Sequence, residues 1–279
     1  MGRSLLAVIF PQKFTPAIIS ESRDFESLWK TKKHWVFSNL SHIAYFSSEQ
    51  IQTFMQQLGA EKTCFYNHKG AQAYLSIWED KAVLCFRGTQ SVENPTERQD
   101  HLNFVRKFFL RFLIKLPINP FSLLSINNDI WADLKLIQTS FNNQSSTKVH
   151  SGFLEEINKI WDNSEIENNI LNDIQQHVGE KPIWVTGHSL GGAMATLAGM
   201  KYSFQAVTTF GEPRVGKNIG KSFISTTHTR FVNGDDPVTK VPPRLFSYYK
   251  HHGNKIHIHK EPSDFIYDHS IIYYSENLY

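Results

Sequence analysis

A serine in a glycine-rich turn is the residue best suited to covalent chemistry. Ser189 lies in Gly187-His188-Ser189-Leu190-Gly191-Gly192, between an apolar run at residues 183–186 and an alanine-rich segment at residues 190–202. The first segment is typical of a buried strand and the second of a helix. A Gly-x-Ser-x-Gly turn in that setting presents the serine hydroxyl above a sheet, with glycines where side chains would collide. The pattern favours a nucleophile at Ser189, with the Leu190 amide as an oxyanion donor, over a turn that only packs helix on strand.

A nucleophilic serine needs a histidine as base and a carboxylate that orients it, in the chain order Ser, Asp or Glu, His. Asp236 follows an apolar run at residues 230–232, and functional residues lie at the carboxyl ends of strands in parallel sheets. Asp235 stays an alternative, because a slip of one residue cannot be resolved from the pattern. The base also stays open at this point. The histidines after Ser189 are His228, His251, His252, His257, His259 and His269.

The rest of the chain alternates helical and strand-like segments that must position these groups. Residues 36–58 have helical periodicity, and two strand-like runs at 71–78 and 82–86 are separated by a turn. Residues 153–178 indicate one or two amphipathic helices, and further strands are expected at 206–210, 230–232 and 255–260. Strands that alternate with helices favour a mainly parallel sheet flanked by helices.

Several further short blocks accompany the serine turn. They are Phe86-Arg87-Gly88-Thr89, Val149-His150-Ser151-Gly152-Phe153, Thr209-Phe210-Gly211-Glu212-Pro213-Arg214-Val215-Gly216, Asp236-Pro237-Val238 and Asp268-His269-Ser270. In these blocks and in their order, the chain resembles the class 3 lipases, a family with the α/β-hydrolase fold. The resemblance implies a single domain over residues 1–279, an acyl-ester hydrolase activity and a Ser-Asp-His triad.

The resemblance implies a role for each site residue. His269 lies in the Asp-His-Ser block and is expected to be the base, and Asp236 matches the block that carries the acid. Thr89 matches the oxyanion segment and is expected to give the second donor, beside the Leu190 amide. Neither a metal nor an organic cofactor is implied.

A long segment at residues 90–128 departs from the family pattern. Residues 129–134 resemble a block that in relatives follows Gly-Thr almost directly, so residues 90–128 are expected to be an inserted, lid-like element. At about 100° per residue, residues 102–117 are expected to form a helix with large apolar side chains on one face. Basic side chains lie together on another face, an arrangement typical of peripheral contact with a membrane or lipid droplet. The alternative is a helix packed on the domain. The apolar residues are Leu102, Val105, Phe108, Phe109, Phe112, Leu113 and Leu116, and the basic ones Lys107, Arg111 and Lys115.

Composition excludes several classes of protein. The 279 residues are 41% hydrophobic and 20% charged, which is a globular rather than a disordered composition. A net charge of +3 does not indicate nucleic-acid binding, and two cysteines cannot form a disulfide framework. The apolar run at residues 5–10 is shorter than a signal-peptide core, and no stretch is long enough to span a bilayer. We therefore expect a protein of the cytoplasm, or one exported without a cleaved leader.

Together these features predict a serine hydrolase that cleaves lipid esters, with acylglycerols as the first candidate substrates. A phospholipase, a short-chain esterase and an acyltransferase would use the same residues. A lipid-surface binding module with an inactive triad is the alternative outside enzymes.

Overall fold

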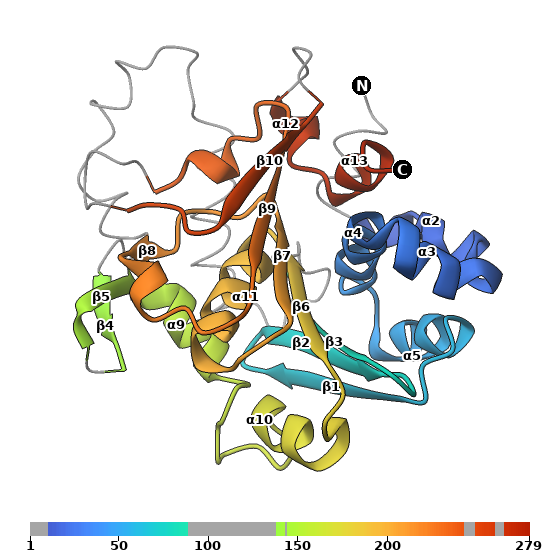
Figure 1. Cartoon of the computed structure of the whole chain (residues 1–279), viewed down its shortest axis with the longest axis horizontal. Coiled ribbons are helices and arrows are strands. Elements are labelled where there is room, and N and C mark those ends of the chain that lie inside the picture. The colour runs from blue at the N-terminus through green and yellow to red at the C-terminus, as the bar shows by residue number, and fades with distance from the viewer. Residues whose placement is uncertain (1–10, 89–137, 143, 243–248, 260–264) are drawn as a thin grey trace.

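A seven-stranded sheet forms the centre of the molecule, and Ser189 and Asp236 follow the carboxyl ends of two of its parallel strands. The computed structural model describes residues 11–88, 138–142, 144–242, 249–259 and 265–279 (Figure 1). The strand order is β1-β2-β3-β6-β7-β9-β10, with β1 and β2 antiparallel and the strands from β3 to β10 parallel. The strands are β1 (Lys62–His68), β2 (Ala71–Ile77), β3 (Ala82–Phe86), β6 (Ile183–His188), β7 (Ala206–Phe210), β9 (His228–Asn233) and β10 (Asn254–Ile258). The predicted mainly parallel sheet is confirmed.

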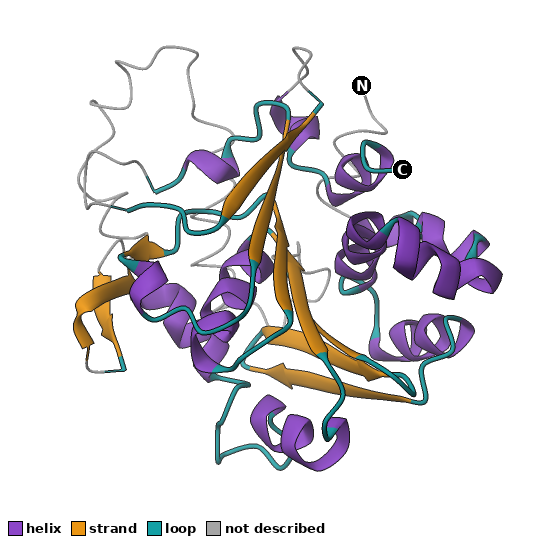
Figure 2. Cartoon of the chain, in the orientation of Figure 1, coloured by secondary structure: helices purple, strands orange, loops and turns teal. Residues whose placement is uncertain are grey.

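Helices cover both faces of this sheet, as Figure 2 shows. Apolar side chains of β3 alternate between two cores: Leu84 packs with α9, α10 and α11, whereas Val83 packs with α2, α3, α4, α5 and α13. This alternation is what a strand buried on both faces requires. The helices and helical turns are η1 (Pro11–Lys13), α2 (Ala17–Ser20), η2 (Ser22–Asp24), α3 (Phe25–Thr31), α4 (Lys33–Ile43), α5 (Ser48–Gln57), α9 (Ser151–Asn158), α10 (Ile170–Asp173), η5 (Ile174–Val178), α11 (Leu190–Lys201), η6 (Ile219–Lys221), η7 (Val238–Lys240), α12 (Phe265–Asp268) and α13 (Ile271–Glu276). In the part of the chain that the structure describes, no helix has the length and apolar character needed to cross a bilayer.

Some local structure differs from the sequence pattern. The helical segment predicted at residues 36–58 is two helices, because the Ser47 side chain accepts a hydrogen bond from the Gln50 amide and starts α5 as a new helix. A second, three-stranded antiparallel sheet was not predicted. Its strands are β4 (Gln138–Phe141), β5 (Gln144–His150) and β8 (Gly216–Lys217). The lid-like segment predicted at residues 90–128 and its helix at residues 102–117 lie outside the described residues, as does Thr89.

Candidate active site

The turn between β6 and α11 holds Ser189 in a backbone conformation that a serine rarely adopts. Its φ and ψ are 60° and −127°. A residue held there costs free energy, and such residues cluster at functional sites. The Ser189 amide donates to the carbonyl of Phe210 at 2.9 Å, and its carbonyl accepts from the Gly192 amide at 2.9 Å. The strained residue is therefore tied to the neighbouring strand β7 on one side and to its own helix on the other.

The two glycines of the motif are needed because backbone segments touch each other there. A Cβ at Gly187 would collide with the carbonyl of Gly191, and a Cβ at Gly191 would collide with the carbonyl of Phe86. Helix α11 can thus begin directly against the ends of β6 and β3. The first amides of a helix have no carbonyl four residues earlier in the helix to bond, and they lie at its positive end. Leu190 is the first residue of α11 and directly follows Ser189, which is the position predicted for an oxyanion donor.

The structure brings the three predicted triad residues together. The Nε2 atom of His269 lies 3.1 Å from the Ser189 hydroxyl oxygen. Its Nδ1 atom lies 3.0 Å and 2.9 Å from the two carboxylate oxygens of Asp236. All three residues are buried, with exposed fractions of 2% for Ser189, 4% for His269 and 0% for Asp236. This chain of contacts lets the imidazole take the serine proton while the carboxylate stabilises the resulting cation.

Asp235, the alternative acid, is directed elsewhere. Its carboxylate is 76% exposed and pairs with the Lys240 ammonium at 3.1 Å. Its amide donates to the carboxylate of Asp268 at 2.7 Å, which joins the loop after β9 to the segment before His269. Asp268 therefore links the loop that carries Asp236 to the segment that carries His269.

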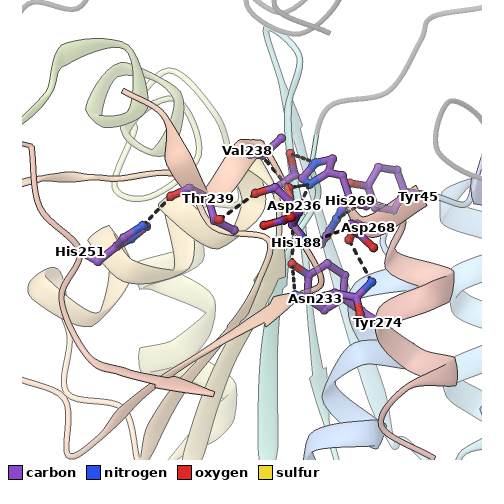
Figure 3. A network of polar contacts seen from close by, with 12 residues as sticks. Tyr45, His188, Asn233, Asp236, Val238, Thr239, His251, Asp268, His269 and Tyr274 are labelled. Carbon is purple, nitrogen blue, oxygen red and sulfur yellow. Dashed lines mark hydrogen bonds and ion pairs between the residues drawn. The ribbon is translucent and has the colours of Figure 1, made fainter. Parts of the chain in front are cut away.

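The carboxylate of Asp236 accepts further hydrogen bonds that the sequence did not reveal. The Tyr274 hydroxyl donates to Oδ2 at 2.7 Å, and the Val238 amide donates to Oδ1 at 2.9 Å (Figure 3). The same hydroxyl accepts from the Asn233 amide at 3.0 Å, which fixes its direction. Burial, followed by the charge of Asp236, raises the pKa of Tyr274 well above its usual value, so the phenol stays protonated and donates. Tyr274 thus fixes the position of the Asp236 carboxylate.

Replacing Tyr274 with phenylalanine should lower kcat by roughly tenfold to a hundredfold, because a hydrogen bond to a charged group is worth about 1.5–3 kcal/mol. KM should stay nearly unchanged, since Tyr274 is buried behind the acid. Tyr273→Phe removes the same hydroxyl from the same helix and is the control, with kcat expected near wild type. Steady-state kinetics of both variants measure the split. An equal loss in the two variants, or a loss confined to KM, would contradict the assignment.

His188, the residue before Ser189, contacts the backbone of His269. Its Nε2–H donates to the carbonyl of His269 at 2.8 Å, and its Nδ1 accepts from the Tyr45 hydroxyl at 2.8 Å (Figure 3). Burial, followed by the proximity of His269, lowers the pKa of His188 well below its usual value. The ring is therefore neutral at neutral pH, with the proton on the nitrogen that faces the carbonyl. His188 is part of the serine motif in the sequence, but its hydrogen bond to the carbonyl of His269 joins segments far apart in the chain.

Gly211, which follows β7, leaves room for the imidazole. Its φ is 59°, and a Cβ there would lie 2.7 Å from Asp236 Oδ2 and 3.0 Å from His269 Nδ1. A side chain at this position would displace the acid and the base together. The block at residues 209–216 therefore contributes space to the site. Among the described residues, no three His, Cys, Asp or Glu side chains are grouped as a metal site would need.

Comparison with known proteins finds similarity to lipases. A family model described as "Lipase (class 3)" matches residues 122–246, which include Ser189 and Asp236. A lipase of Rhizomucor miehei is 35% identical over 136 residues, 44% of this chain and 36% of that protein. Secreted mono- and diacylglycerol lipase 1 of Fusarium solani is 38% identical over 110 residues, 36% of this chain and 31% of that protein. The chain thus matches about a third of the length of these relatives.

Solved structures share the fold. One is a triacylglycerol lipase described as having a serine protease triad as its catalytic centre; it superposes with a TM-score of 0.55 at 24% identity and covers 81% of this chain and 79% of that one. A fungal lipase in complex with an inhibitor superposes with a TM-score of 0.52 at 22% identity, over 85% and 81% of the two chains. The serine turn, the ordered blocks, the sheet topology and these matches agree: residues 122–246 are similar to class 3 lipases, and the chain has the α/β-hydrolase fold.

Proposed function

We propose that this protein is a serine hydrolase that cleaves carboxylic ester bonds of lipids, with acylglycerols as its main substrates. The observation that carries the proposal is the continuous hydrogen-bonded chain from the Ser189 hydroxyl through His269 to Asp236. The strained turn at Ser189 supports it, because a purely structural serine would not need φ 60° at a helix start.

In the proposed mechanism, the Ser189 oxygen attacks the ester carbonyl while its proton passes to Nε2 of His269. Asp236 holds Nδ1–H of the imidazole and stabilises the positive charge that develops there. The Leu190 amide, together with the predicted donor Thr89, stabilises the oxyanion. The imidazolium then gives its proton to the leaving alcohol, and water activated by His269 hydrolyses the acyl-enzyme.

Lipid esters are the proposed substrate class for two reasons. Relatives are named as lipases and as mono- and diacylglycerol lipases. The amphipathic pattern at residues 102–117 suits a lid-like element that contacts a lipid surface. A phospholipase is the second candidate, because a segment of 79 residues is 42% identical to an Arabidopsis thaliana phospholipase A(1).

A substrate panel tests this proposal. Purified protein should hydrolyse triacylglycerol and diacylglycerol emulsions faster than the same concentration of a dissolved short-chain ester. The rate should rise when substrate passes its solubility limit, because the lid-like segment contacts the interface. A variant that lacks residues 98–118 should lose this rise and keep activity on the dissolved ester. Equal or greater rates on dissolved esters with no rise would indicate a short-chain esterase, and preference for phospholipid vesicles would indicate a phospholipase.

A further inference from the structure

A basic pocket lies next to the loop that carries the catalytic acid, and the proposed reaction does not use it. Its volume is about 590 Å³, within the usual range for small-molecule sites. The loop after β9, the start of β10 and the segment at residues 249–251 surround it. The charged side chains of this basic pocket are Arg214, Arg230, Lys240, Lys250, Lys255 and Asp235.

Positive charge exceeds negative charge among the side chains that line the basic pocket. Asp235 is the carboxylate among the lining residues and pairs with Lys240. Such an exposed pair contributes little to stability, so it can open when a ligand anion arrives. Glu212 is buried and does not line the pocket, but its carboxylate offsets part of the positive charge of Arg230. Arg214, Lys250 and Lys255 add further cationic side chains to the pocket lining.

Both arginines are fixed before any ligand binds. Arg214 donates to the carbonyls of Lys240 and Pro242, the second at 2.7 Å. Arg230 donates to the carbonyl of His252 at 2.8 Å. Cations that are held in place lose little conformational entropy when they bind an anion, whereas free surface side chains lose more. The pocket is therefore preorganised for negative charge.

His251 provides a polar atom that lacks a partner among the described residues. Its Nε2–H donates to the carbonyl of Thr239 at 2.8 Å, and the buried Nδ1 has no hydrogen bond in that part of the chain. Burial, followed by the charge of Arg230, lowers the pKa of His251 to about 4, so the ring is neutral at pH 7 and Nδ1 is an acceptor. This acceptor nitrogen suits a hydroxyl on the ligand. In Figure 3 His251 lies on the other side of Thr239 from Asp236 and His269.

We propose that this basic pocket binds a phosphate group, carried by a lipid headgroup or by a small soluble phosphate ester. A fatty acid suits it less well, because Val232 and Tyr249 are the only large apolar side chains among its lining residues. A phosphate group with two negative charges matches the cations that line the pocket, and a hydroxyl on the alcohol part of a soluble ligand would donate to Nδ1 of His251. The Thr239 hydroxyl donates to the carbonyl of Asp236 at 2.8 Å, so an occupied pocket would contact the loop that holds the acid.

Binding without hydrolysis tests this inference separately from the proposed activity. Inorganic phosphate and glycerol 3-phosphate are titrated into the full chain by calorimetry. Vesicles of ether-linked phosphatidylcholine, with and without ether-linked phosphatidic acid, are used in flotation, because ether lipids contain no ester for the triad to cleave. The double variant Lys250→Ala, Lys255→Ala removes two exposed cations of the pocket. The control Lys30→Ala, Lys62→Ala removes the same charge from α3 and from β1, at the opposite edge of the sheet.

The pocket variant should bind at least about tenfold more weakly than wild type, which corresponds to roughly 0.7 kcal/mol for each removed cation. The control should bind like wild type, and both variants should keep their rate on a dissolved ester. Weakened binding of soluble phosphates supports a free ester as ligand, and weakened binding of phosphatidic acid vesicles alone supports a headgroup. Equal binding by the pocket variant and the control, or no binding of any of these probes to wild type, would overturn the inference.

Discussion

Replacing Ser189 with alanine is expected to lower kcat by roughly 10⁴- to 10⁶-fold, the range found when a triad nucleophile is removed. Alanine removes the hydroxyl that lies 3.1 Å from Nε2 of His269, so the imidazole loses the group whose proton it would accept. The fold should persist, because Ser189 is tied to its neighbours by backbone groups that alanine keeps. Rates on a dissolved ester, with circular dichroism and a thermal melt of the same samples, measure both expectations.

A fluorophosphonate probe gives an independent measure of the same hydroxyl. Wild-type protein should be labelled at Ser189, and Ser189→Ala should not be labelled at all. Ser38→Ala is a matched control: Ser38 is also fully buried, and its hydroxyl donates to the carbonyl of Trp35, away from the triad. A wild type that resists the probe would favour a lipid-binding module with an inactive triad. Full activity in Ser189→Ala would place the chemistry on another residue.

The fold and the nucleophile turn were predictable because local sequence determines them. Residues 183–188 alternate sides in the sheet, and the glycines at 187 and 191 are required by contacts within one turn. The mainly parallel sheet was predicted from strands that alternate with helices. Features that depend on residues close together in the chain can therefore be recognised in the sequence.

The supporting contacts were not predictable, because they join segments that are far apart in the chain. Tyr274 reaches Asp236 only because α13 packs beside the end of β9, and Tyr45 reaches His188 only because α4 lies against β6. Neither tyrosine belongs to a motif. The pattern likewise could not decide between Asp235 and Asp236, since that choice depends on the turn after β9, which sends one carboxylate inward and the next outward.

Replacing Asp236 with asparagine is expected to lower kcat by roughly 10⁴-fold, with little change in the fold. Both oxygens of the carboxylate accept: Oδ1 from the Val238 amide and Oδ2 from the Tyr274 hydroxyl, and both from His269. An asparagine NH₂ group at either position meets a donor. The imidazole is then held with Nδ1 as acceptor and its proton on Nε2, which points at Ser189 and cannot accept the serine proton.

Asp235→Asn is the matched control, because it makes the same chemical change one residue away. It removes an exposed ion pair with Lys240, and its backbone amide can still donate to Asp268. We expect activity within about twofold of wild type, since exposed pairs contribute about 0–1 kcal/mol. Because each variant alters one carboxylate of the same loop, steady-state rates on one dissolved ester decide between them. If Asp235→Asn lost activity while Asp236→Asn kept it, the inward carboxylate would not be the group that orients His269, and the triad would have to be assigned anew.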